Sequence, residues 1–305
     1  MRGFAATTDY DWFESLIRLS PRPAEINFWR SGSDVPFKAL RPGEPLFFKL
    51  KQPRHAIAGF GFFAYFSPLP IAVAWDVYGQ ANGARTLREF RESLFRARIS
   101  DARDERRDLW AGCILLNQPV FFPEEDWIRA PEEWTPTVGQ GMTLDLSHGE
   151  GKRIWDECLV KSRGERILDS QPVPGGGFPL MMPRLGPRSF HIAVFDSYGR
   201  RCAVTGESTL PALAAAHIRI DGELPAHTVN NGILLRADIQ KLFVAGYVTV
   251  NSDSEFLVSS RLVREFSNGH EYERLQGTKI RLPEDPSARP LAEALWWHNE
   301  ERFLG

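Results

Sequence analysis

The sequence predicts an α+β protein with two folding units joined by a linker. Up to about residue 160, short apolar runs typical of strands are interrupted by segments with helical periodicity. The segment from Gln171 to Pro187 then contains three consecutive glycines and five prolines, which resist regular structure. After it, a strand, a polar loop, a second strand and a helix follow in that order. We therefore expect units at 1–160 and 188–305, with a linker at 161–187.

The overall composition sets limits on the class of protein. A chain of 305 residues with a net charge of −2 is long enough for two cores of ordinary size. This near-neutral balance is atypical of histone-like and ribosomal proteins. Basic residues outnumber acidic ones from Arg22 to Arg54 and from Lys161 to Ile220, which fits nucleic-acid binding and equally fits a solvated surface. No apolar run reaches transmembrane length and the N-terminus lacks a signal-peptide pattern, so we expect a cytoplasmic protein without membrane contact.

The three cysteines, Cys113, Cys158 and Cys202, are far apart, and none belongs to a C-x-x-C pair. This spacing is atypical of a structural zinc site, so we expect none. An odd number of scattered cysteines also indicates a reducing compartment. Cys202 is interpreted as a small core residue.

The most informative segment lies directly after the linker. An apolar run ends at His217, and a polar loop of about a dozen residues then reaches Asn231. An apolar run at 233–235 and a helical segment at 237–245 follow, and Gly246 is placed to end the helix. This order of strand, loop, strand and helix is the layout of a ββα-metal nuclease finger.

The segment resembles the HNH endonucleases. The pieces that carry the resemblance are C-x-x-T-G at 202–206, A-A-H-I at 215–218, N-G-I-L-L-R at 231–236 and the end of the helix at 240–246. Hydrolysis of a phosphodiester needs a deprotonated water, and a neutral imidazole can accept that proton near working pH. By resemblance, His217 is the general base and Asn231 fixes the loop. The resemblance also implies Mg²⁺ or Mn²⁺ as the cofactor that neutralises the phosphate.

The sequence departs from this family where the metal ion is usually bound. Gln240 stands at the helix position that is usually His, and Val244 stands where an Asp is usual. Ala216 precedes the base, where many HNH proteins carry a metal-binding His or Asp. A neutral amide oxygen is a weaker magnesium ligand than a carboxylate. Two alternatives stay open: an active endonuclease with Gln240 as a metal ligand, and a protein of the same fold that only binds modified DNA or RNA.

The first unit alternates strands and helices around an apolar centre. A helix is expected from an N-cap at Asp9 to Arg18, because apolar residues recur between them at helical spacing. The Gly-spaced strand at 55–66 suits a strongly curved sheet, in which Gly59 and Gly61 relieve crowding. Further helices are expected at 69–78, 86–99 and 150–160, and further strands at 26–29, 45–51 and 111–116. These elements predict a small, partly open β-barrel with helices.

Several pieces of this unit resemble the PUA-superfamily domains, in particular the EVE and SRA-like readers. They are E-I-N-F-W at 25–29, G-x-P-x-x-F-K-L-K at 43–51, G-F-G-F-F at 59–63 and G-C-I-L-L-x-x-P-x-F-F at 112–122. Such readers occur fused to HNH nucleases in modification-dependent restriction proteins. The resemblance implies a pocket that receives a flipped cytosine with a 5-methyl or 5-hydroxymethyl group from double-stranded DNA. Some PUA-like domains read RNA, which is the alternative partner.

A pocket for a flipped base needs aromatic faces that replace the lost stacking and polar groups that meet the base edge. The residues expected to supply them are Trp29, Arg30, Trp75, Asp76 and Tyr78. Each aromatic residue has core packing as its alternative role, because the chain is rich in Phe and Trp.

Three arginines are expected to contact the DNA backbone. Arg184 and Arg188 lie at the end of the linker, and Arg236 follows the second strand of the finger. A solvated linker is the alternative interpretation of the first two. The chain has no G-x-x-x-x-G-K-[ST] phosphate loop, so we do not expect use of ATP.

The segments after the finger are expected to complete its core, because a finger without zinc is too small to be stable alone. They comprise a strand at 255–258, a helical turn at 261–266 and a helix at 291–303. Trp296, Trp297 and Phe303 are expected to form the packing side of the last helix.

Together these features predict a modification-dependent DNA endonuclease, a hydrolase of the restriction type. Its first unit recognises modified cytosine, and its second unit hydrolyses nearby phosphodiester bonds. Because two strands need two cuts, a homodimer or a second recruited copy is expected.

Overall fold

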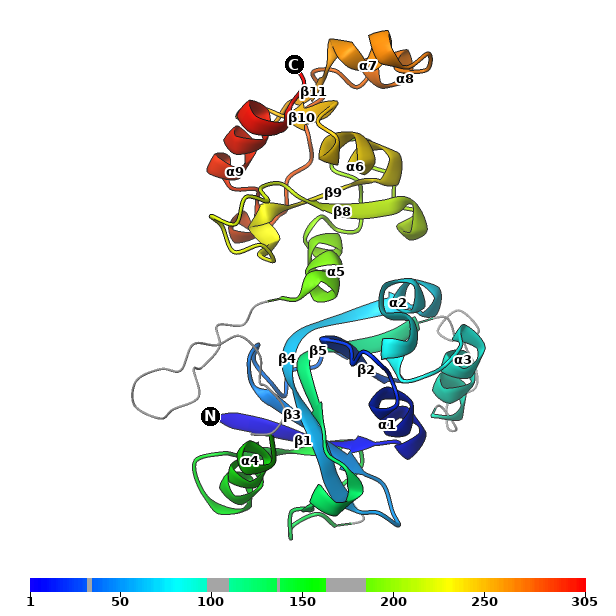
Figure 1. Ribbon diagram of the computed structural model, residues 1–305, viewed down its shortest axis with the longest axis vertical. Helices are drawn as coiled ribbons and strands as arrows, with labels where there is room; N and C mark the ends of the chain where they lie inside the picture. Colours follow the sequence, from blue (N-terminus) through cyan, green and yellow to red (C-terminus); the bar gives the residue numbers. More distant parts are fainter. Residues whose placement is uncertain (32–34, 98–109, 136–137, 163–184) are drawn as a thin grey trace. The chain divides into compact units, whose positions relative to one another are not determined.

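The computed structural model describes residues 1–31, 35–97, 110–135, 138–162 and 185–305 (Figure 1). The chain divides into two compact units, Met1–Ser189 and Phe190–Gly305. The greater part of the expected linker, 163–184, lies outside the described residues. None of the helices in the described part is both long and apolar enough to cross a membrane. Both units combine helices with strands, which confirms the α+β class.

The first unit is built on a seven-stranded sheet with the order β2-β5-β4-β3-β1-β7, and β6 pairs with β4. The strands are β1 (Arg2–Thr8), β2 (Glu25–Arg30), β3 (Pro45–Leu50), β4 (Ala56–Pro70), β5 (Trp110–Phe121), β6 (Ile128–Arg129) and β7 (Gly141–Asp145). β1 runs parallel to β3, and the other pairs are antiparallel. The four expected strands are therefore present, and β1, β6 and β7 are additional. Closure into a partly open barrel stays a prediction.

The long strand β4 bends where its glycines lie. The register of β4 against β5 shifts between Phe60 and Phe62 and again between Phe63 and Tyr65. A Cβ atom at Gly59 would lie 2.2 Å from the carbonyl oxygen of Val120, and the φ of Gly59 is +156°. Only glycine therefore allows β5 to approach this closely, as the spacing of the strand predicts.

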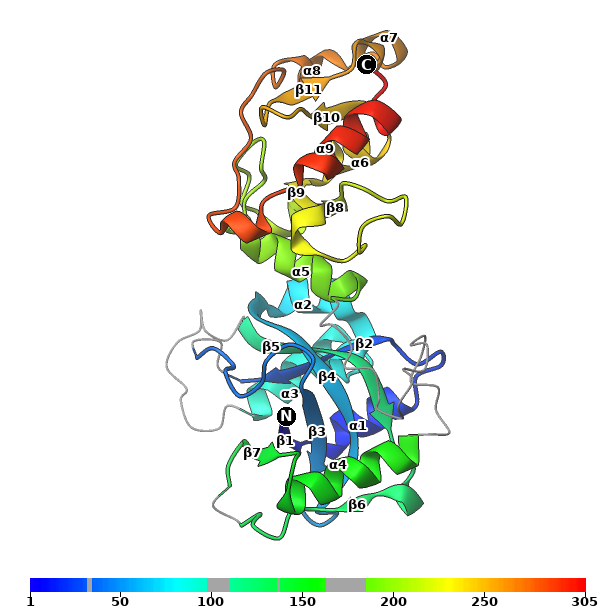
Figure 2. The same cartoon turned by 90° about the vertical axis from the view of Figure 1, so that its left-hand side faces the viewer.

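Alternate side chains of β3 pack on opposite faces of the sheet. The ring of Phe47 lies 6.0 Å from that of Trp155 on α4 (Gly149–Lys161). The ring of Phe48 lies 5.3 Å from that of Trp12 on α1 (Tyr10–Ile17). The two helices cover opposite faces of the sheet, as Figure 1 shows, and Figure 2 shows α4 crossing it. The core of the first unit therefore consists of two aromatic layers.

The helices of the first unit begin close to the predicted positions. The carboxylate of Asp9 accepts a hydrogen bond from the backbone N–H of Asp11 at 3.1 Å, which confirms the N-cap of α1. The helix expected at 69–78 is α2 (Ile71–Tyr78), which starts late because β4 continues to Pro70. The helix expected at 86–99 is α3 (Leu87–Arg96), and residues 98–99 lie outside the described part.

The second unit contains the predicted strand, loop, strand and helix. β8 (Leu213–His217) pairs antiparallel with β9 (Gly232–Arg236), and α6 (Ala237–Val244) follows β9 directly. Figure 2 shows α6 beside these two strands. The remaining elements are β10 (Val248–Val250), β11 (Phe256–Val258), α7 (Ser260–Glu265), α8 (His270–Glu273) and α9 (Ala292–Trp297).

One helix, α5 (Pro187–Ser197), was not predicted by the sequence. Its first turn is bound by the buried carboxylate of Glu25, which accepts hydrogen bonds from the backbone N–H groups of Arg188 at 2.7 Å and Ser189 at 2.8 Å. A negative charge is favourable at a helix N-terminus. The helix therefore begins on a residue far away in the sequence, which a local pattern does not reveal.

The last helix packs on a different side from the predicted one. α9 continues as a π-helical turn, His298–Arg302, and the side chain of Trp296 is 64% exposed. The prediction for Trp296 is therefore wrong. His298 lies in the core instead, where its ring stacks on Phe243 at 3.7 Å and its Nδ1 lies 2.8 Å from the Thr249 hydroxyl. These contacts fix the side of the helix that faces inward.

Candidate active site

The imidazole of His217 is held at the end of β8 by an aromatic ring of α5. His217 pairs with Gly232 on β9, and its ring stacks on Phe190 with centroids 4.0 Å apart and an interplanar angle of 11°. A Cβ atom at Gly232 would lie 2.5 Å from Val194 Cγ2. Glycine at this position therefore lets the strand pair lie close to α5. The N-G pair of the motif thus has a packing role.

A second imidazole lies against the first. His227 Nδ1 is 3.1 Å from His217 Nε2, within hydrogen-bonding distance. Burial lowers the pKa of His217 below its ordinary value, and the neighbouring His227 lowers it further. The ring of His217 is therefore neutral at neutral pH, as a general base must be. Sequence reasoning missed His227, and the available signal was a second histidine in the same polar loop.

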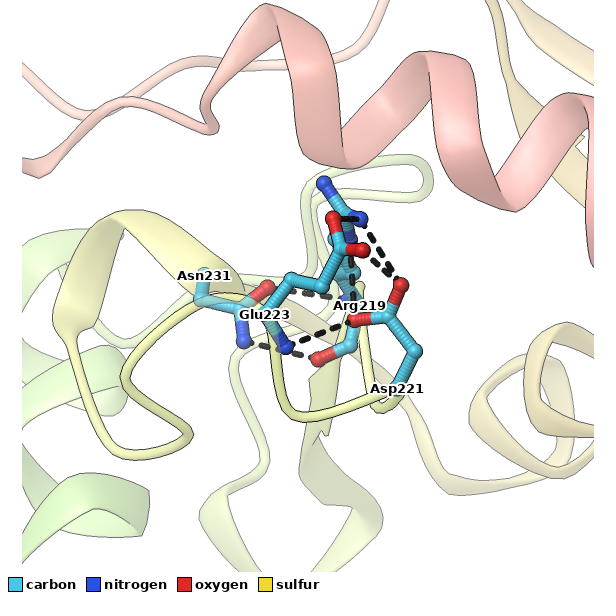
Figure 3. A network of polar contacts seen from close by, with 4 residues as sticks. All are labelled: Arg219, Asp221, Glu223 and Asn231. Atoms are coloured by element: carbon cyan, nitrogen blue, oxygen red, sulfur yellow. Dashed lines mark hydrogen bonds and ion pairs between the residues drawn. The ribbon is translucent and has the colours of Figure 1, made fainter.

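Asn231 closes the loop between the two strands. Its side chain is fully buried, its Oδ1 accepts a hydrogen bond from the Arg219 N–H, and its Nδ2 donates one to the Arg219 carbonyl, both at 2.9 Å (Figure 3). The same Nδ2 also donates to the Ala226 carbonyl at 3.4 Å. One amide therefore ties both ends of the loop together, the arrangement that the predicted loop-fixing role requires.

The charged side chains of this loop bind one another. The Arg219 guanidinium pairs with Asp221 at 2.8 Å and also with Glu223, as Figure 3 shows. Hydrogen bonding to Arg219 lowers the pKa of Asp221 below its ordinary value. Both acidic residues of the loop are therefore already paired with the Arg219 cation.

The C-x-x-T-G turn is attached to the end of β9 through a thiol. The Sγ atom of the buried Cys202 accepts hydrogen bonds from the backbone N–H groups of Thr205 at 3.4 Å and Arg236 at 3.2 Å. The guanidinium of Arg236 makes two hydrogen bonds of 2.7 Å to Asp238. This pairing holds the pKa of Asp238 down at about 2. A phosphate contact by Arg236 would therefore have to use Nη1 or compete with Asp238 for Nε and Nη2.

The residues around His217 do not fit a magnesium site. Magnesium and manganese prefer oxygen ligands, above all carboxylates. Gln240 on α6 offers only a neutral amide as a ligand. Val244, which is 46% exposed, and the buried Ala216 have apolar side chains that cannot bind a metal ion. Among the described residues, no three His, Cys, Asp or Glu side chains are grouped so that they could hold a metal ion.

The first unit contains a cavity of about 600 Å³ between β1, β2, α1 and α3. Its wall combines aromatic and basic side chains, which include Phe4, Trp12, Phe28, Phe37, Lys38, Lys51 and Arg96. Trp29 and Arg30 also line it, as expected of pocket residues, whereas Trp75, Asp76 and Tyr78 are not part of this wall. Two of the five predicted pocket residues therefore line the cavity, and the other three lie elsewhere in the first unit.

In the described part of this cavity's wall, Arg30 is the residue whose buried side-chain hydrogen-bond donors lack partners. Its Nε and Nη2 atoms are buried and have no hydrogen-bond partner among the described residues. Its guanidinium lies 5.2 Å from the centre of the Phe66 ring, and burial lowers its pKa. The indole N–H of the neighbouring Trp29 is already used, because it donates to the Asn82 carbonyl at 2.9 Å.

The remaining predicted residues have local roles. The ring of Trp75 lies 6.3 Å from that of Phe90 on α3, and Asp76 is exposed on α2. Tyr78 is buried, with the Arg188 guanidinium 5.7 Å from its ring. Arg188 Nη1 also donates to the Glu25 carbonyl at 3.3 Å, so this side chain is engaged within the first unit. Arg184 lies outside the described residues.

Comparison with protein families identifies the segment that carries His217 and Asn231. Residues 202–251 match the HNH endonuclease family. The match runs from the C-x-x-T-G turn through β8, the loop, β9 and α6 to the end of β10. It supports a nuclease domain, and therefore nucleic-acid binding, in this part of the chain.

Among solved structures, the first unit is similar to the ASCH protein of Zymomonas mobilis. A mutant form is 12% identical with a TM-score of 0.33, and the match covers 50% of this chain and 96% of that chain. The ASCH protein itself is 12% identical with a TM-score of 0.32, and covers 52% and 94%. A similarity of this size carries no functional inference. No curated protein sequence matches the chain.

Proposed function

We propose that this protein is a DNA endonuclease of the HNH type that is directed to its substrate by a modified cytosine. The observation that supports this most strongly is the imidazole of His217, which ends β8 inside the HNH match. The ring is kept neutral by burial and is held by Phe190 and His227. This is the state that a general base requires.

The residues of the chain account for the proton-transfer part of the reaction. Nε2 of His217 is directed at His227, which leaves Nδ1 as the nitrogen that accepts the proton of the attacking water. Stacking on Phe190 fixes the plane of the His217 ring, and the loop closed by Asn231 fixes the position of His227. General-base catalysis of this kind contributes about 10²- to 10⁴-fold to a rate.

Stabilisation of the phosphate and the leaving oxygen is the larger contribution in most hydrolytic enzymes. Mg²⁺ or Mn²⁺ supplies it in HNH nucleases, but the described residues contain no group of three His, Cys, Asp or Glu side chains that could hold such an ion. We therefore expect hydrolysis to be slow. The same observation favours a second candidate function, in which the HNH unit binds modified DNA or RNA without cleaving it.

The cavity of the first unit is the proposed site for the modified base. Its volume of about 600 Å³ lies within the range of small-molecule pockets, which is roughly 300–1,000 Å³. Its aromatic wall offers stacking surfaces, and Arg30, Lys38 and Arg96 offer donors to a base edge or a phosphate. Trp75, Asp76 and Tyr78 do not line this cavity, so their proposed contact with the base would need a different surface of the first unit.

The decisive experiment uses three matched plasmids that carry cytosine, 5-methylcytosine or 5-hydroxymethylcytosine. Each is incubated with the full-length protein and Mg²⁺, Mn²⁺ or a chelator, and nicked and linear products are counted separately, because a linear product indicates two cooperating copies. We expect the modified plasmids alone to be cut, and His217→Ala to abolish cutting. His270→Ala is the control, since His270 is exposed on α8.

Each other outcome decides between the candidate functions. Equal cutting of all three plasmids would contradict recognition of a modified base but not the nuclease. Tight binding of the modified plasmids without a cut under any condition would support the second candidate. A preference for structured RNA over modified DNA in a competition assay would identify RNA as the partner.

A further inference from the structure

We propose that His227 is a positioning residue that shares one proton with His217 and thereby selects the nitrogen of His217 that acts as the base. This inference rests on the proposed function, because it assigns a role in the reaction that His217 is proposed to perform. It is carried by three observations: the contact between the two rings, the network that holds the loop, and the aromatic wall beside both imidazoles.

The first observation is the distance of 3.1 Å between His217 Nε2 and His227 Nδ1. Two imidazole nitrogens this close must share one hydrogen, because two lone pairs or two N–H groups would repel each other. When the hydrogen is on His217 Nε2, the lone pair of His217 is on Nδ1, and the ring can accept a proton there. When the hydrogen is on His227 Nδ1, His217 carries its own hydrogen on Nδ1 and cannot act as a base.

The productive tautomer is also the one that fits the next step. After His217 accepts the proton of the water at Nδ1, its Nε2–H donates to the neutral His227, and no other bond changes. The pair therefore provides a base only when the shared hydrogen is on His217 Nε2.

The second observation is the network that places His227. Asn231 bonds both backbone groups of Arg219 and also the carbonyl of Ala226, the residue directly before His227. The Arg219 side chain in turn pairs with Asp221 and Glu223, which ties the middle of the loop to the start of the loop (Figure 3). The network therefore connects the residue two positions after His217 with the residue one position before His227.

The third observation is an aromatic ring that lies beside both imidazoles. Phe190 lies 4.0 Å from the ring of His217 and 5.9 Å from that of His227. Several charged groups on the neighbouring elements form ion pairs of their own, namely Arg219 with Asp221 and Glu223, Arg200 with Asp196, and Arg236 with Asp238. A hydrogen bond is stronger in such an environment than in water.

The test is a measurement of the tautomer of His217 that does not depend on cleavage. Full-length protein with ¹⁵N-labelled histidine is compared with His227→Ala and His227→Asn, in which the Asn oxygen can replace Nδ1 as an acceptor. We expect His217 to carry its hydrogen on Nε2 in the wild type and in His227→Asn, and to populate both tautomers in His227→Ala.

The rate of plasmid cutting should follow the tautomer. It should fall roughly tenfold or more in His227→Ala and recover in His227→Asn, because a ring in the wrong tautomer is not a base. An unchanged tautomer in His227→Ala, or 1:1 binding of Zn²⁺ by the two rings, would overturn the proposal. A tautomer change in a protein that never cuts DNA would contradict the proposed function and leave the role of His227 in place.

Discussion

The side-chain amide of Asn231 binds both backbone polar groups of Arg219, with its Oδ1 on the N–H and its Nδ2 on the carbonyl, each at 2.9 Å. No other single side chain could satisfy this donor and acceptor at once with the same geometry except another planar amide. The loop that carries His227 therefore depends on one buried residue.

Replacing Asn231 by Ala should disorder this loop and lower the free energy of unfolding of the second unit by about 1–3 kcal/mol, the usual cost of leaving buried polar groups unpaired. Asn231→Asp should not restore it, because a carboxylate cannot donate to the Arg219 carbonyl. Denaturant unfolding and amide hydrogen exchange of residues 218–230 measure both effects. Asn230→Ala is the control, and equal losses in the two variants would contradict the role assigned to Asn231.

Arg30→Met should separate stability from binding in the first unit. Two buried guanidinium nitrogens of Arg30 have no partner among the described residues, so loss of the charge should leave the free energy of unfolding unchanged or raise it. Affinity for a duplex with 5-methylcytosine should fall, because the cavity loses a cationic donor. Fluorescence anisotropy and denaturant unfolding test this, with the exposed Arg91→Met as the control. A destabilised protein with unchanged affinity would show that Arg30 is structural.

The second unit should become less stable in mild acid because of His298. Burial lowers the pKa of this ring to about 4, so the folded state holds it neutral while the unfolded chain protonates it near pH 6.5. The stability that it contributes is therefore complete above pH 6.5 and is lost as the pH falls towards 4. The loss at pH 5 should be roughly 2 kcal/mol. His298→Gln should weaken this pH dependence, and an identical pH profile in both proteins would contradict the assignment.

Gly246 should tolerate alanine far less than Gly277 does. Both have positive φ, +82° and +74°, but a Cβ atom at Gly246 would lie 2.1 Å from the Arg302 carbonyl, whereas nothing lies within 4 Å at Gly277. We expect Gly277→Ala to cost about 1 kcal/mol for the backbone conformation alone. Gly246→Ala should cost clearly more, since α9 must move. Thermal unfolding of the two variants measures the difference, and equal melting temperatures would refute it.

The strand, loop, strand and helix around His217 were predictable because their signals are local. The apolar run that ends at His217, the Asn-Gly pair and Gly246 after the helix each fix a boundary within a few residues. By contrast, α5 is capped by Glu25, and His217 meets Phe190 and His227 only after the chain folds. Contacts between residues distant in sequence leave no periodic signal.

The pocket residues illustrate the same limit. Trp29 and Trp75 are both aromatic and both near the end of a regular element, yet only Trp29 lines the cavity. Trp75 packs on Phe90 of α3, a contact that the sequence of α2 alone does not specify. Trp296 was misplaced for a related reason, because the inward side of α9 is decided by the hydrogen bonds of His298 rather than by its largest residues.

The most direct test of the central claim is the initial rate of strand cleavage on a plasmid with 5-methylcytosine, compared between the wild type, His217→Ala and His270→Ala. We expect slow cleavage by the wild type and by His270→Ala and none by His217→Ala, while all three proteins bind the plasmid equally. Cleavage by His217→Ala at the wild-type rate would contradict the assignment of His217 as the general base.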